Sequence, residues 1–176
     1  MCILSYDDAL EFTEDMFELD PFDDLDDFEH DKMHEIYQAH PSLSQERMSD
    51  DALPLLHILQ YQPSLELVKC VYDAYPEAIQ EVDGVDHTPL HVACLYKCSL
   101  EVVEFIAKSY PEACKKWSSY GGAPIDLARQ HKDEGSNDVV QALFKLRPHV
   151  RFHKDTKGSS SPEDESQQQQ LVFACY

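Results

Sequence analysis

Apolar residues recur in the same helical pattern in three segments of the chain. In each segment they lie at positions i, i+1 and i+4, which places them on one face of an α-helix. The three stripes are Leu67-Val68-Val71, Val102-Val103-Ile106 and Val139-Val140-Leu143. A serine, which is a favoured N-cap residue, precedes each stripe, and a proline follows it and stops the helix. These flanking residues are Ser64 and Pro76, Ser99 and Pro111, and Ser136 and Pro148.

A shorter helix is predicted before each stripe. Pro54, Pro89 and Pro124 follow one another at a spacing of 35 residues, and proline is favoured at the first position of a helix. The last unit is two residues longer, and the extra residues fit best within 131–135. A fixed period of this size predicts helix pairs that bury their apolar faces against neighbouring pairs.

The sequence before the first full unit predicts only half a helix pair. Met33, Ile36 and Tyr37 mark one helix over residues 32–40. We therefore predict an all-α solenoid of about three helix pairs with an N-terminal half-unit cap. The expected segments are a disordered acidic and aromatic stretch at 1–31, the cap at 32–44, units at 45–79, 80–114 and 115–151, and a disordered polar tail at 152–176.

The middle unit resembles the ankyrin repeat. Asp83, the run Thr88-Pro89-Leu90-His91-Val92-Ala93-Cys94, and Leu100-Glu101-Val102-Val103 follow the ankyrin pattern, although Leu56 and Asp126 stand at the histidine position of the other two units. The resemblance implies an ankyrin-type solenoid in which Thr88 and His91 are structural, because their side chains tie the turn to the helix start. It also implies that partner proteins bind to the connecting fingers and to the exposed side of the first helices.

The fingers supply the expected partner-binding surface. The stretches 77–87 and 112–122 are too long for tight turns and too short for another helix. We expect the partner to contact finger and first-helix positions that the periodic core leaves over: Asp86, His87, Tyr96, Trp117 and Tyr120. Trp117 is the only tryptophan and a suitable interface anchor. Alternatively, it folds back on the neighbouring finger as local core.

The charge of the chain is negative and uneven. There are 34 acidic and 14 basic residues, a net charge of −20, and residues 1–52 alone hold 17 acids and 2 bases. Nucleic acid and anionic membranes repel such a chain, so we expect neither as a direct ligand. The five glycines form no phosphate loop and no nucleophile elbow. We predict a protein without catalytic activity or a cofactor.

The cysteines are typical of a reducing compartment. The six of them show no disulfide-framework spacing, and no signal peptide or membrane span is apparent. We expect a monomer in the cytoplasm or nucleus. His91, Cys94 and Cys98 could share a helical face and bind zinc, but the pattern lacks paired Cys-x-x-Cys spacing. We therefore interpret Cys94 as a core residue and expect no metal.

The acidic N-terminal segment carries large apolar residues at regular intervals. They are Phe12, Met16, Leu19, Phe22, Leu25 and Phe28. This composition resembles acidic activation segments that fold on binding. The alternatives are a solvated tail, an arm that packs on the first unit, and an arm that folds back on the basic residues within 145–157. Residues 171–176 are also apolar and could dock on the last unit.

The predicted function is that of an adaptor or scaffold. We expect the chain to bind one or more proteins, of unknown identity, through its fingers and first helices. The alternative is a transcriptional or signalling co-regulator that uses the acidic segment as a second binding motif.

Overall fold

The computed structural model describes residues 4–17, 27–48, 51–119, 121–132 and 134–146. These residues are helical and form no strand, apart from an isolated bridge between Ser118 and Gly122, so the all-α prediction is confirmed. The α-helices are α1 (Tyr6–Phe17), α2 (Asp27–Ala39), α3 (Pro54–Ile58), α4 (Leu65–Ala74), α5 (Pro89–Leu95), α6 (Leu100–Ser109), α7 (Pro124–Gln130) and α8 (Glu134–Leu146).

The predicted helix starts are confirmed where proline and serine set them. Pro54, Pro89 and Pro124 are the first residues of α3, α5 and α7, where the missing N–H removes no helical hydrogen bond. Ser64 Oγ accepts a hydrogen bond from the N–H of Leu67 at 3.2 Å and caps α4. Ser99 caps α6 in the same way. The last helix, α8, begins at Glu134 rather than after Ser136.

Short 3-10 helices occupy part of each connection, so the prediction that these stretches contain no further helix is wrong. They are η1 (Pro41–Gln45), η3 (Pro76–Gln80) and η4 (Pro111–Lys115), and a fourth, η2 (Leu59–Tyr61), continues α3. Each of η1, η3 and η4 is five residues long, and short connecting pieces of helix often adopt the tighter i to i+3 hydrogen bonds. Proline begins each of the three, because its fixed φ suits a helical turn.

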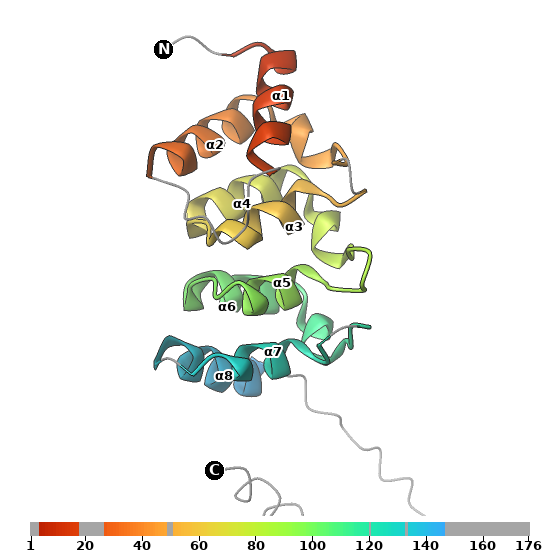
Figure 1. Ribbon diagram of the computed structural model, residues 1–176, viewed down its shortest axis with the longest axis vertical. Helices are drawn as coiled ribbons and strands as arrows, with labels where there is room; N and C mark the ends of the chain where they lie inside the picture. Colours follow the sequence, from red (N-terminus) through yellow and green to blue (C-terminus); the bar gives the residue numbers. More distant parts are fainter. Residues whose placement is uncertain (1–3, 18–26, 49–50, 120, 133, 147–176) are drawn as a thin grey trace, which may run out of the picture.

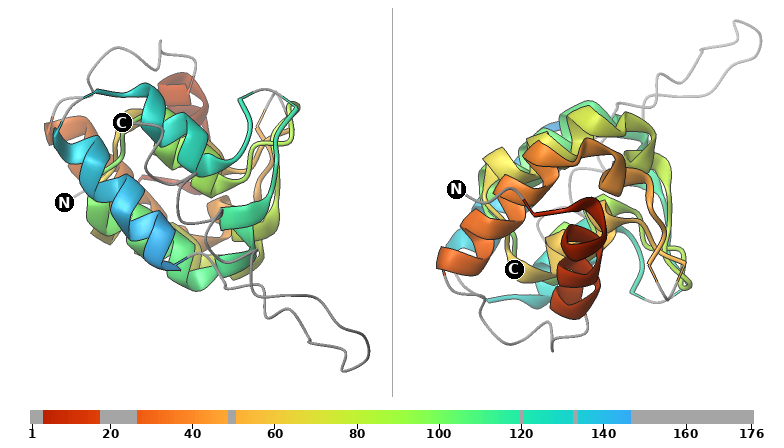
Figure 2. Two further views of the ribbon diagram at one scale, coloured as in Figure 1. Left: turned by 90° about the horizontal axis from the view of Figure 1, so that it is seen from below. Right: turned by 90° about the horizontal axis from the view of Figure 1, so that it is seen from above.

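The helix pairs lie one above another as layers (Figure 1). The layers are α3 with α4, α5 with α6, and α7 with α8; α5 packs on α7, and α6 packs on both α4 and α8. Leu90, Ala93, Val103 and Ile106 of the middle layer are fully buried between its neighbours. The connections project to one side of the stack, roughly across the helix direction (Figure 2). We call residues 41–53, 76–88 and 111–123 the first, second and third fingers.

The N-terminal segment contains a packed helix, which corrects the prediction of disorder for the described part of residues 1–31, namely 4–17 and 27–31. In α1, Ala9, Thr13 and Met16 are buried, and the ring of Phe17 stacks on that of His57 in α3, with centroids 4.8 Å apart. Their spacing of i, i+4, i+7 and i+8 gives one helical face, and burial of that face stabilises the helix.

Helix α1 contacts α2, the helix of the predicted half-unit cap, in two places. The imidazole of His40, just after α2, is 3.0 Å from the carbonyl of Leu4, and Lys32 Nζ lies 3.8 Å from the centre of the Phe12 ring. The first contact joins the start of α1 to the end of α2 and the second joins the middle of each, so the two helices run in roughly opposite directions. The start of α2 at Asp27 also precedes the predicted start at residue 32.

The position of α1 excludes the prediction that this part of the acidic arm folds back on the basic residues within 145–157, at the C-terminal end of the stack. Figure 1 shows α1 beside α2 and α3, at the end opposite α7 and α8. Apolar contacts with the first layers hold it there, whereas the attraction expected from residues 145–157 is between solvated, screened charges. Most of that basic stretch, and the tail predicted at 152–176, lie outside the described residues.

None of the helices in the described ranges is long and apolar enough to cross a membrane.

Candidate protein-binding surface

Asp83 organises the second finger. Its Oδ1 accepts hydrogen bonds from the N–H groups of Val85 and His87, at 2.9 and 2.8 Å, and its Oδ2 lies 3.0 Å from Nδ1 of His87. An aspartate that bonds the backbone two residues further on fixes a tight turn. The turn carries Asp86 at φ 64°, a left-handed conformation. The equivalent positions of the other fingers, Asp51 and Gly121, also have positive φ.

Hydrogen bonds tie neighbouring fingers together. The N–H of Ser119 in the third finger donates to the carbonyl of Val85 in the second at 3.1 Å, and the Ser119 hydroxyl donates to the Asp86 carboxylate. On the other side, the Arg47 guanidinium donates to the Glu81 carboxylate at 2.9 Å and links the first finger to the second. The fingers therefore form one connected surface along the stack.

Exposed apolar side chains lie on the second and third fingers. Val82 is 38% exposed, Val85 41% and Trp117 72%, and these are three of the five exposed large apolar residues in the described ranges. The hydrogen bond from Ser119 to Val85 brings the Trp117 segment beside the other two. We call Val82, Val85 and Trp117 the finger patch.

The structure supports only part of the predicted partner surface. Asp86 and Trp117 are exposed on the fingers, and Trp117 is therefore not the local core residue that the alternative required. His87 is only 5% exposed, which is a correction, because its bond to Asp83 turns the ring inward. Tyr96 is half-buried at the far end of α5 from the fingers. Tyr120 lies outside the described residues.

Sequence reasoning missed the two valines of the finger patch. The period supplies the signal that could have found Val82, which stands 35 residues before Trp117. Val85 has no such marker. Its exposure follows from the turn that Asp83 fixes, because a side chain at the tip of a short turn has nothing to pack against.

Thr88 and His91 join the second finger to α5 and to the next layer. The N–H of Thr88 donates to Nδ1 of His91 at 3.1 Å, so Nδ1 is the acceptor and the proton lies on Nε2. Nε2 donates to the carbonyl of Gly122 in the third finger at 3.2 Å. Burial lowers the pKa of His91 to about 4, with a further contribution from nearby His87. The imidazole is therefore neutral at pH 7, as both hydrogen bonds require.

The N-terminal motif residues do not form the accessible face that its composition predicts. Met16 is buried and Phe12 is half-buried against the stack, whereas Phe28 at the start of α2 is 71% exposed. Residues Leu19, Phe22 and Leu25 lie outside the described ranges. The arrangement matches the alternative of an arm that packs on the first unit.

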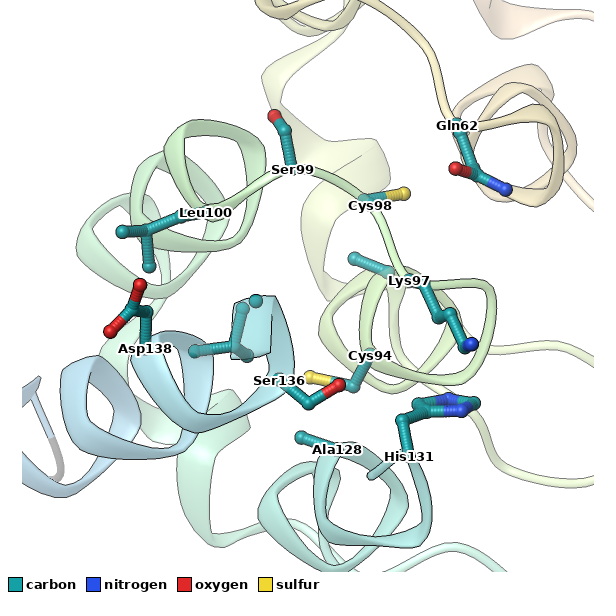
Figure 3. Close-up of a pocket in the computed structure, with 13 residues that line it drawn as sticks. Gln62, Cys94, Lys97, Cys98, Ser99, Leu100, Ala128, His131, Ser136 and Asp138 are labelled. Atoms are coloured by element: carbon teal, nitrogen blue, oxygen red, sulfur yellow. The ribbon is translucent and has the colours of Figure 1, made fainter. Parts of the chain in front are cut away.

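A cavity of about 390 Å³ opens between the α5–α6 and α7–α8 turns, away from the fingers (Figure 3). Cys94, Cys98, His131 and Ser136 are among the residues that line it. Burial raises the pKa of the Cys98 thiol to about 12 and also raises that of Cys94, so neither thiol is a nucleophile at pH 7.

Two of the three side chains considered for zinc, His91 and Cys98, have other partners. Cys98 Sγ donates to the carbonyl of Leu59 at 3.1 Å, and both ring nitrogens of His91 are hydrogen-bonded. In the described part of the chain, no group of three His, Cys, Asp or Glu residues converges in a way that could hold a metal ion.

No protein-family model matches the sequence, and no curated protein matches it.

Proposed function

We propose that the chain is an ankyrin-type solenoid that acts as a protein-binding adaptor or scaffold. The Thr-Pro-Leu-His motif of the middle unit, the 35-residue spacing of the helix starts and the layered helix pairs support this assignment. The unit boundaries at 45–79, 80–114 and 115–151 belong to the same proposal. Partners bind to the fingers and to the exposed side of the first helices.

The finger patch is the observation that carries the proposal. Three carboxylates of the second finger already have partners: Asp83 bonds His87, Asp86 bonds Ser119, and Glu81 bonds Arg47. Burial of the apolar side chains of Val82, Val85 and Trp117 by a partner would contribute favourable binding free energy, since it removes apolar surface from water. Because hydrogen bonds already order the fingers, binding costs less conformational entropy.

The remaining parts of the proposal follow from charge and from the thiols. The chain acts without catalysis or a cofactor and binds neither nucleic acid nor membrane directly, since its net charge of −20 disfavours both. It is a monomer of the cytoplasm or nucleus. The free thiols of Cys70, Cys94, Cys98 and Cys114 support a reducing compartment.

A comparison of two exposed aromatic residues tests the finger patch. The wild type, Trp117→Ala and Phe144→Ala are used as baits in extract of the native cell, and captured proteins are quantified by mass spectrometry. Phe144 is the matched control, because it is an exposed aromatic residue on α8 outside the fingers. We expect Trp117→Ala to lose a specific partner that Phe144→Ala retains.

Melting temperatures of the same variants distinguish a binding surface from a core. Trp117→Ala should melt within a few degrees of the wild type, since substitutions of exposed side chains change stability by only about 0.5 kcal/mol. Partner capture that is unaffected by Trp117→Ala, or a large fall in its melting temperature, would refute the finger patch.

A second candidate function is that of a transcriptional or signalling co-regulator. The exposed ring of Phe28 among acidic residues favours it, although Phe12 and Met16 are covered by the stack. A Phe28→Ala bait separates the two functions. Loss of a partner with Phe28→Ala but not with Trp117→Ala would favour the acidic segment.

A further inference from the structure

The described residues leave the last layer, α7 with α8, incompletely covered on the side that faces away from α5 and α6. Val68 and Val103 stand at the same position of α4 and α6, and both are fully buried because another layer lies below them. Val140 stands at that position of α8 and is only half-buried. The difference arises from position in the stack and not from residue type, since all three are valine.

Two larger side chains lie at equivalent places. Arg129 in α7 is exposed, whereas Leu59 and Cys94, at the same position of the earlier layers, are buried. Phe144 is 48% exposed, whereas Ala107 at the same position of α6 is fully buried. Arg129, Val140 and Phe144 therefore define a surface, which we call the end face, where a further layer would pack.

The end face combines the apolar side chains of Val140 and Phe144 with the positive charge of Arg129. The Arg129 guanidinium lies 5.1 Å from the centre of the Phe144 ring and 3.8 Å from the Asp126 carboxylate. Lys132 after α7 and Lys145 in α8 are exposed nearby in the sequence. At the other end of the stack, α1 packs over α3 with its buried face.

We propose that residues 171–176, Leu-Val-Phe-Ala-Cys-Tyr, cover the end face of the same molecule. The described chain leaves the stack at Leu146, the last residue of α8, so 24 residues separate it from Leu171. A flexible coil of that length spans roughly 27 Å, which is ample to return to the layer that it has just left.

Charge and connectivity favour this occupant. Glu163, Asp164 and Glu165 precede the apolar residues, and Arg129 on the end face, with Lys132 and Lys145 close to it in the sequence, carries positive charge. Attachment through a short linker holds a segment at an effective concentration on the order of millimolar, so a weak apolar contact is enough to populate the docked state. A second molecule at ordinary protein concentration has no such advantage.

Photo-crosslinking tests which segment occupies the end face. A benzophenone amino acid replaces Phe173 in the full chain, and the irradiated protein is digested and analysed by mass spectrometry. We expect crosslinks to peptides from residues 124–146, in a product of monomer mass. The same probe at Ser160 is the control and should not give that pattern. Crosslinks to the end face only in a dimer-mass product, or crosslinks elsewhere, would overturn the proposal.

Hydrogen exchange tests whether docking protects the last layer. Val172→Asp with Phe173→Asp introduces two charges into the apolar segment, and Ser160→Asp with Ser161→Asp introduces the same charges outside it. The first pair should accelerate amide exchange in α8 by roughly tenfold, which corresponds to loss of a weak intramolecular contact. The second pair should leave exchange unchanged. Equal exchange in both variants and in the wild type would overturn the proposal.

Discussion

His91 in α5 and Gly122 in the third finger are 31 residues apart, and Nε2 of His91 donates a hydrogen bond to the Gly122 carbonyl at 3.2 Å. The other ring nitrogen accepts from the N–H of Thr88. One imidazole therefore fixes the start of its own helix and the position of the next finger. The connection holds only while the ring is neutral, because protonation of Nδ1 removes the acceptor for Thr88.

Stability should therefore depend on the protonation of His91. The folded pKa of about 4 is below the ordinary 6.5, so the unfolded chain binds the proton more readily. Stability from the neutral ring is fully present above about pH 6.5 and is lost as pH falls toward 4, by about 3 kcal/mol. We expect the free energy of unfolding in urea to fall between pH 7 and pH 4 by about 3 kcal/mol less in His91→Gln than in the wild type.

Other histidines and carboxylates also change the unfolding free energy in this pH range. The quantity to compare is therefore the difference between the pH profiles of the wild type and of His91→Gln. His34, which is more exposed on α2, provides the matched control as His34→Gln. Its profile should run parallel to that of the wild type. A His91→Gln profile that also runs parallel would show that the ring does not lose its hydrogen bonds on protonation.

Val103→Asp should unfold the middle layer. Val103 is fully buried between α4 and α8, so an aspartate there would bury a carboxylate without a partner. We expect a loss of more than about 4 kcal/mol in the free energy of unfolding, which is a large part of the stability of a small domain. Lys108→Asp, at an exposed position of the same helix, is the control. A cooperative melt unchanged by Val103→Asp would refute the layered core.

Tyr37→Phe should be neutral or stabilising, although the residue is fully buried. Its hydroxyl has no hydrogen-bond partner within the described residues, and burial raises its pKa far above the ordinary value. An unsatisfied buried hydroxyl costs about 1–3 kcal/mol, and phenylalanine removes it without loss of ring packing. Chemical unfolding measures the change. A loss of more than about 1 kcal/mol would show that the hydroxyl is satisfied in solution.

Phe17→Ala should release α1 from the stack and leave the other layers folded. The Phe17 ring stacks on His57 and lies 6.4 Å from the ring of Tyr61, so its removal takes away much of the contact between α1 and α3. We expect amide hydrogens in α1 to exchange at nearly the rate of an unfolded chain, with slow exchange retained in α5 and α6. Phe28→Ala, which removes an exposed ring, should leave α1 protected.

The sequence predicted the candidate site only in part. Trp117 and Asp86 are exposed on the fingers, as expected from their place in the period. His87 is adjacent to Asp86 but points inward, because Asp83 bonds both its ring and its N–H. Periodicity assigns a residue to a loop, whereas hydrogen bonds made within that loop decide which side chains reach solvent.

The helix starts of the repeating units were determined by the sequence itself. Pro54, Pro89 and Pro124 begin the first helices, and Ser64 and Ser99 cap the second, because the fixed φ of proline and the serine hydroxyl act within one turn of the chain. The helical spacing of the apolar residues is enough to identify the stripes that follow. Such local signals need no knowledge of what lies on the other side of the helix.

Only the tertiary structure decided the state of α1 and the exposure of the last layer. The acidic residues of α1 are typical of a disordered segment, but a stack of layers offers the Ala9, Thr13 and Met16 face a surface to cover. Val140 has the same place in its apolar stripe as Val103, and it is only half-buried because none of the described residues forms a layer below it. Burial depends on neighbours that are distant in the chain. The local sequence of a segment does not show which distant segment packs against it.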